Sequence, residues 1–178
     1  MAHEGFRLLR LRRDRFDDSP WYGYMVSESD ELLVLQVVSD RYDLLDGYRV
    51  LRRSDVSSLE ETFERADLIE RALRLKGLRP SAPKVIALTS MRAMMEAIQC
   101  EYGLLTIQRE EVTSDECEIG QVRISSEDTY VLRWLGPEAR WEVDDRPFRY
   151  RDVTRLEFGG EYERTLLMVA KEREGSTE

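Results

Sequence analysis

The chain has 178 residues, of which 42% are hydrophobic and 35% are charged, and its net charge is −9 at pH 7. This length suits one ordinary domain or two small ones. The negative charge argues against nonspecific nucleic-acid binding, no apolar run is long enough to span a membrane, and two cysteines are too few for a disulfide framework. Because the N-terminus also lacks an apolar secretory signal, the sequence predicts a cytoplasmic protein of a bacterium or archaeon.

The first 60 residues are predicted to form short strands. Apolar residues alternate with polar ones, or gather in short runs rich in β-branched and aromatic residues. The expected strands are FRLLRLRR (6–13), WYGYMVS (21–27), LLVLQVV (32–38), YRVLRR (48–53) and DVSSLE (55–60).

The pattern then changes to a helical period. Ser58 and Glu61 have the spacing of a capping box, apolar residues follow at helical intervals, and Gly77 is a stop signal. We therefore expect a helix that ends at Gly77. After the linker RPSAP (79–83), a second helix is expected from about Ser90 to Tyr102.

Strand patterns return in the second half of the chain. A terminal helix over YERTLLMVAKE (162–172) follows them, although TLLMVA alone is also compatible with a strand. The expected strands are LLTIQRE (104–110), IGQVRIS (119–125), TYVLRWL (129–135), RPFRYR (146–151) and DVTRLEF (152–158).

The two strand regions are related by an internal repeat. With an offset of 97 residues, ten positions between residues 23 and 60 are identical to their counterparts, which indicates a duplication of units 5–60 and 102–157. The identical pairs are Gly23/Gly120, Ser29/Ser126, Val34/Val131, Leu35/Leu132, Arg49/Arg146, Arg52/Arg149, Asp55/Asp152, Val56/Val153, Leu59/Leu156 and Glu60/Glu157.

Five strands in about 56 residues favour a small, strongly bent antiparallel barrel, with Gly23 and Gly120 where a strand bends. The predicted fold class is mostly β with helices (α+β), as two tandem five-stranded barrels joined by a helical linker. The expected domains are a first barrel (1–60), the helical region (61–101), a second barrel (102–160) and a C-terminal helix and tail (161–178).

With Gly-x-Val at residues 120–122 in a second strand, this pattern resembles the Sm-like and SH3-like small-barrel folds. The segment RYRDVTRLEFGGEYE (149–163) is similar to the closing segment of a group of uncharacterised bacterial tandem small-barrel proteins. The resemblance covers most of the chain and implies a fold but no activity. RNA-binding Sm proteins use an asparagine loop and an Arg-Gly dipeptide, and this sequence contains neither.

The repeated motif Arg-x-x-Asp-Val-Ser/Thr-x-Leu-Glu is interpreted as structural. Asp55 and Asp152 lie between strands, where a carboxylate can accept backbone N–H bonds of a turn. The apolar members of the motif are expected to point into the core; they are Val56, Val153, Leu59 and Leu156.

Catalytic and metal chemistry find no support in the sequence. The single histidine, His3, is near the terminus, and neither Cys100 nor Cys117 has a histidine partner. The acidic clusters lack the spacing of a calcium loop, and no phosphate-binding glycine motif is present. We therefore expect a protein that is not an enzyme and holds no cofactor or metal.

The candidate binding residues are arginines and loop aromatics. If the first and fourth strands were neighbours, their arginines would form a positive stripe. The loop aromatics could line a peptide groove, stack on nucleic-acid bases, or only cover the open end of a barrel. These residues are Arg10, Arg12, Arg49, Arg52, Tyr42 and Trp141.

Three functions remain open from the sequence. The first is a scaffold that binds a protein or peptide partner, because duplication without a catalytic constellation suits recognition and open strand edges suit strand addition. The second is RNA or single-stranded nucleic-acid binding through the arginines, which the net charge disfavours. The third is a small-molecule sensor, and a homodimer through strand edges is also left open.

Overall fold

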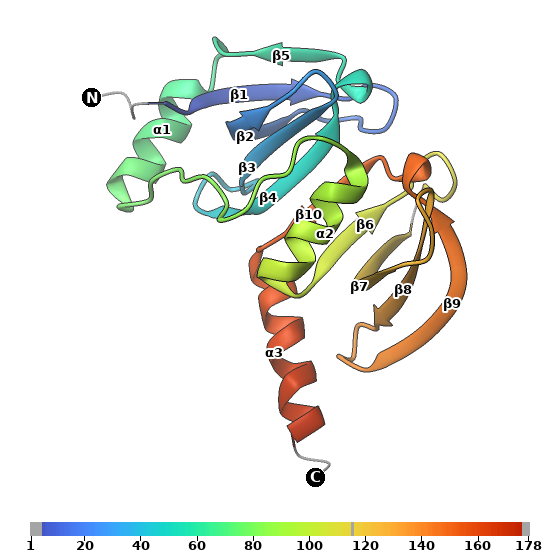
Figure 1. Ribbon diagram of the computed structural model, residues 1–178. Helices are drawn as coiled ribbons and strands as arrows, with labels where there is room; N and C mark the ends of the chain where they lie inside the picture. The colour runs from blue at the N-terminus through green and yellow to red at the C-terminus, as the bar shows by residue number, and fades with distance from the viewer. Residues whose placement is uncertain (1–4, 115, 176–178) are drawn as a thin grey trace. The chain divides into compact units, whose positions relative to one another are not determined.

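A computed structural model describes residues 5–114 and 116–175. The backbone divides into two compact units, Met1–Lys84 and Val85–Glu178, each with a five-stranded antiparallel sheet (Figure 1). The mostly β composition with helices is therefore as predicted. The unit boundary falls inside the region predicted as helical, at 61–101, so its two helices belong to different units.

The first unit contains five strands, a single-turn 3-10 helix and one α-helix. Its elements are β1 (Arg7–Arg12), β2 (Trp21–Glu28), β3 (Leu32–Val38), β4 (Leu45–Arg52), η1 (Arg53–Asp55), β5 (Ser58–Glu60) and α1 (Ala66–Leu75).

The second unit opens with a helix and closes with the longest helix of the chain. Its elements are α2 (Met91–Tyr102), β6 (Leu105–Gln108), β7 (Cys117–Ile124), β8 (Thr129–Leu135), β9 (Trp141–Arg149), η2 (Tyr150–Asp152), β10 (Arg155–Phe158) and α3 (Glu161–Gly175).

The same strand order occurs in both units. It runs β5-β1-β2-β3-β4 in the first unit and β10-β6-β7-β8-β9 in the second. The register also agrees: Gly23 is opposite Val37, and Gly120 is opposite Trp134 at the same offset of 97. The two sheets therefore share their strand order and the position of this glycine. The registers differ elsewhere, because Arg49 is opposite Leu35 whereas Asp144, not Arg146, is opposite Leu132.

The prediction of closed barrels is wrong, because both sheets are open. A barrel of this order would close through pairing of the fourth and fifth strands of one unit. In the described residues, β5 pairs with β1 and β10 with β6, and neither pairs with the fourth strand of its own unit. The fifth strands are short, at three and four residues.

The sheet of the first unit has apolar side chains on both faces. One face carries Leu9 and Leu11 with Met25, and Leu59 packs against them. On the other face α1 covers Leu8 by means of its two buried residues, Ile69 and Leu73.

The capping box predicted at Ser58 does not form, and α1 begins only at Ala66. Ser58 lies instead in β5, opposite Arg12 of β1, and the Glu61 carboxylate accepts a hydrogen bond of 2.7 Å from Arg7 Nη1. Long-range strand pairing therefore overrides the local helix signal at these residues.

The other two helices agree with the sequence expectations. Ser90 caps α2 by accepting a hydrogen bond of 3.1 Å from the Ala93 backbone N–H, and Gly103 ends that helix in a left-handed conformation. The TLLMVA segment is helical and lies within α3.

Burial of tyrosines predicts a weakness at alkaline pH. Desolvation, with a smaller contribution from Glu70, raises the pKa of Tyr24 from 10.0 to about 12. The unfolded chain therefore releases this proton first, and stability present below pH 10 is lost as the pH rises from 10 towards 12. We expect Tyr24→Phe to lose less stability than the wild type between pH 9 and 11.5 in urea unfolding; equal losses would contradict the assignment.

Candidate functional site

The four candidate arginines of the first unit do not form a stripe. Arg10 and Arg12 lie on β1, whereas Arg49 and Arg52 lie on β4. The strand order places β2 and β3 between these two strands. The sequence argument required β1 and β4 to be neighbours, and the antiparallel order of the sheet does not meet that requirement.

Two of these arginines are paired with carboxylates. Arg10 Nη2 lies 2.5 Å from Glu60 Oε2, and Arg12 Nε lies 2.7 Å from Asp14 Oδ1. The first pair follows from the register, because Arg10 and Glu60 are directly opposite each other on β1 and β5. A phosphate group would have to displace both carboxylates, which weakens the case for a nucleic-acid surface.

The Trp21 ring of the first unit is covered by arginines. Arg49 Cζ lies 4.3 Å from the ring centroid and Arg13 Cζ lies 5.0 Å from it. Arg13 is itself fully buried and lies 3.4 Å from Asp17 Oδ2. These cation–π contacts occupy ring surface that a stacked nucleic-acid base would need.

An equivalent arrangement is found in the second unit. Arg109 and Arg146, the repeat counterparts of Arg13 and Arg49, lie over the Phe148 ring at 4.5 and 6.0 Å. The ring comes from β9 here and from β2 in the first unit. Arg13 and Arg109 were not among the candidate residues predicted from the sequence, although their positions agree in the repeat.

The two loop aromatics belong to different units. Tyr42 lies in a loop with φ of 58°, and its hydroxyl accepts a hydrogen bond of 2.7 Å from Arg65 Nη1. Trp141 is not in a loop but begins β9, where it packs against the core while Arg133 Cζ lies 4.3 Å from its ring. Each aromatic side chain is thus held by an arginine of its own unit.

The repeated motif holds the end of the sheet together. Asp55 and Asp152 each end a 3-10 turn. The hydrogen bond that fixes this turn to the chain just after the first strand of the unit is made by the hydroxyl residue two positions later, Ser57 or Thr154, and we call it the hydroxyl clamp. The Ser57 hydroxyl accepts a hydrogen bond of 2.8 Å from the Asp14 backbone N–H. In the second unit, the Thr154 hydroxyl accepts the corresponding bond of 3.1 Å from Glu110.

The apolar members of the motif lie in the cores of their units. Val153 and Leu156 are completely buried, and Val56 and Leu59 are partly buried against the core of the first unit. This burial and the hydroxyl clamp answer why the motif occurs twice, because each sheet needs the same closing turn.

The described residues contain no group of three or more potential metal ligands, and His3 lies outside them. Desolvation, together with the nearby Glu157 carboxylate, raises the pKa of the Cys117 thiol, which makes it a poor nucleophile at neutral pH. Within the described part of the chain, no helix combines the length and the apolar character that crossing a bilayer requires.

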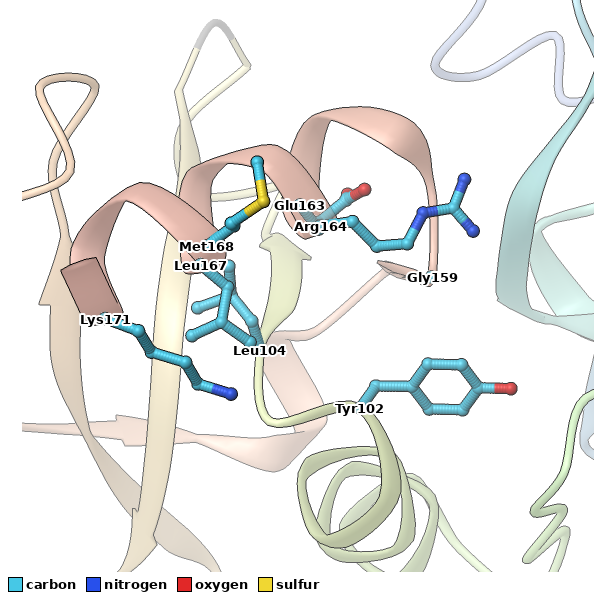
Figure 2. A pocket seen from close by; sticks show the side chains of 8 residues that line it. All are labelled: Tyr102, Leu104, Gly159, Glu163, Arg164, Leu167, Met168 and Lys171. Atoms are coloured by element: carbon cyan, nitrogen blue, oxygen red, sulfur yellow. The ribbon is translucent and has the colours of Figure 1, made fainter.

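A groove along α3 is the best candidate for a binding site in the second unit (Figure 2). Its volume is about 280 Å³, and apolar side chains form much of its wall. Figure 2 shows Tyr102, at the end of α2, opposite the α3 side chains. The lining residues are Tyr102, Leu104, Gly159, Glu163, Arg164, Leu167, Met168 and Lys171.

The position of α3 follows from its sequence. Gly159 has a φ of 67°, which turns the chain out of β10, and the Arg164 N–H donates to the Gly160 carbonyl oxygen in the first helical turn. Leu166 and Ala170 are buried against the sheet. Met168 points away from that face and is 66% exposed.

The polar rim of the groove carries two cations, Arg164 and Lys171, and one carboxylate, Glu163. The Glu163 carboxylate accepts a hydrogen bond of 2.8 Å from the Thr106 hydroxyl, so one of its oxygens is already used. Arg164 Nη2 lies 3.0 Å from Glu161 Oε2 at the exposed surface. Lys171 makes no hydrogen bond or ion pair with the part of the chain that the structure describes.

A second hollow of about 300 Å³ lies on the opposite flank of α3 and includes Tyr162, which is 56% exposed. The sequence analysis missed both flanks. The available signal was the run TLLMVA, which has more apolar residues than a helix with one buried face requires.

Comparisons of the chain with protein-family models, with curated proteins and with solved structures gave no match.

Proposed function

We propose that this protein is a non-catalytic interaction protein that binds a partner protein in the groove along α3. The main support is that Met168 is exposed in an open groove beside Leu167 and Leu104. The opposite face of α3 is already buried against the sheet, so Met168 is not needed to hold the helix in place. Exposed apolar surface of this kind is typical of protein interaction sites.

In this proposal the two sheets form a duplicated scaffold, in which each unit is an open variant of the Sm-like small barrel. The shared strand order and the matching registers of Gly23 and Gly120 support a common origin of the units. The residues shared between the repeats serve turns and cores, so recognition is assigned to α3, which lies outside the repeated part.

Strand addition has less support than groove binding. In the sheet of the second unit, the outer strand β9 contains Pro147, and its register with β8 shifts between Tyr130 and Leu132. In the sheet of the first unit, the outer strand β5 has only three residues. A proline, an irregular register and a short strand are features that protect sheet edges from pairing with other chains.

Nucleic-acid binding also has less support, because the structure separates the arginines of the first unit and pairs two of them. A partner bound through apolar groove contacts would survive nuclease and moderate salt. A nucleic acid held by arginines would be lost under both treatments.

The test uses a photo-crosslinking amino acid placed at Met168 in the full chain, in a lysate of the source organism. We expect a protein adduct that persists after nuclease treatment and in moderate salt. Tyr162, on the opposite flank of the same helix, is the matched control position and should give no such adduct. Absence of a Met168-specific protein adduct would contradict the proposed function.

A further inference from the structure

We propose that the segment bound in this groove is an amphipathic α-helix whose apolar stripe is flanked by acidic residues about one heptad apart. This inference rests on the proposed function and adds the chemistry of the partner. It follows from the spacing of apolar and cationic side chains on α3.

The groove-facing residues of α3 have the spacing that favours a helical partner. Arg164, Leu167, Met168 and Lys171 are separated by three, four and seven positions, so they share one helix surface. Two cations seven residues apart are separated by about 10.5 Å along a helix axis. Acidic residues at the same interval on a helix packed along α3 would match that separation.

An extended peptide matches this pattern less well. In an extended peptide, side chains return to the same face every two residues, or about every 6.6 Å. Two acidic side chains on one face are therefore separated by about 6.6 or 13 Å along the strand, and neither distance matches 10.5 Å. The apolar part of the groove wall comes from Leu167 and Met168, which are consecutive on α3, together with Leu104.

The charge of the rim selects acidic flanks. Glu163 keeps its negative charge and is bonded to Thr106 through one oxygen. The Arg164–Glu161 pair is exposed, so a new carboxylate can join or replace Glu161 at small cost. Lys171 offers an ammonium group with no ion pair among the described residues. Since the chain as a whole carries a charge of −9, this attraction is local and acts only at the groove.

A second copy of the chain is a poor occupant. If two α3 helices packed antiparallel about the point between Leu167 and Met168, Arg164 of one copy would lie beside Lys171 of the other. Like charges would therefore meet on both sides of such an interface.

The proposal is tested by fluorescence anisotropy with two labelled synthetic peptides of about 18 residues. Both carry the same leucine stripe; one has glutamates and the other lysines at flanking positions seven residues apart. We expect the glutamate peptide to bind about tenfold more tightly, which is the combined effect of two exposed charge pairs. Lys171→Glu should remove most of this preference, and Met168→Glu should weaken binding of both peptides.

Control variants are available in the first unit. Leu75→Glu changes an exposed leucine on α1, and Arg74→Glu makes the same charge change as Lys171→Glu. Neither should alter peptide binding. Circular dichroism must show that every variant is folded. If Met168→Glu is not folded, Met168→Ser replaces it.

Four outcomes would overturn the proposal. One is equal binding of the two peptides, and another is undiminished binding of a glutamate peptide made non-helical by a central proline. The third is self-association in sedimentation that Met168→Glu abolishes. If no peptide binds although Met168 crosslinks to a partner protein, the helix inference fails while the proposed function stands.

Discussion

Replacing Gly120 with alanine is expected to destabilise the second unit by about 3 kcal/mol. A Cβ at this position would collide with the backbone carbonyl oxygen of Arg133 and would also press on Leu132. The obstacle is backbone in the neighbouring strand, so the sheet cannot yield by a change of side-chain rotamer. Gly23→Ala should show a similar but smaller effect, because its Cβ would lie 2.7 Å from the Gln36 carbonyl oxygen.

Urea unfolding monitored by hydrogen exchange can assign the loss to each unit. Gly120→Ala should accelerate exchange in β7 and β8, and Gly23→Ala in β2 and β3. Gly175→Ala is the matched control, because a Cβ there meets no atom within 4 Å. A Gly120→Ala protein within 0.5 kcal/mol of the wild type would contradict a close approach of these strands.

Replacing Arg155 with methionine is expected to destabilise the second unit by about 3 kcal/mol at pH 7. Arg155 Nη1 lies 3.2 Å from Glu110 Oε1, and its Nε lies 3.0 Å from Glu157 Oε1. The Arg155 side chain is 13% exposed and that of Glu110 is 9% exposed, so water screens this group poorly. Removing the guanidinium leaves two carboxylates in that environment without their shared cation.

The effect of Arg155→Met should depend on its carboxylate partner, and urea unfolding at pH 7 measures this dependence. The double variant Arg155→Met/Glu110→Gln should regain much of the loss. Arg151→Met is the control, because Arg151 is 74% exposed and should change stability by less than about 0.5 kcal/mol. A double variant that regains no stability would assign the loss to packing instead.

The sequence predicted several elements with the bounds that the structure has. The strands at 32–38 and 129–135 agree at both ends, because runs of apolar residues between turn residues identify largely buried strands. The helix from Ser90 to Gly103 also agrees, because its cap and its terminating glycine act within one turn of the residues that form them.

Other expectations failed where distant segments compete. The capping box at Ser58 does not form, because Ser58 pairs with β1 as part of β5. The paired residues of these two strands are more than 40 positions apart in the sequence. Trp141 was expected in a loop but continues into β9. The arginine stripe failed because spacing within a strand says nothing about which strands are neighbours.

The sequence by itself determined the approximate positions of most strands and of two helices, and that the strand pattern occurs twice. These properties depend on local periodicity and on internal comparison. Only the tertiary structure decided that the sheets are open, that the arginines are separated, and that Met168 is exposed beside Leu104. Burial of one helix face depends on where the sheet lies, and strand order depends on long-range pairing that local patterns do not encode.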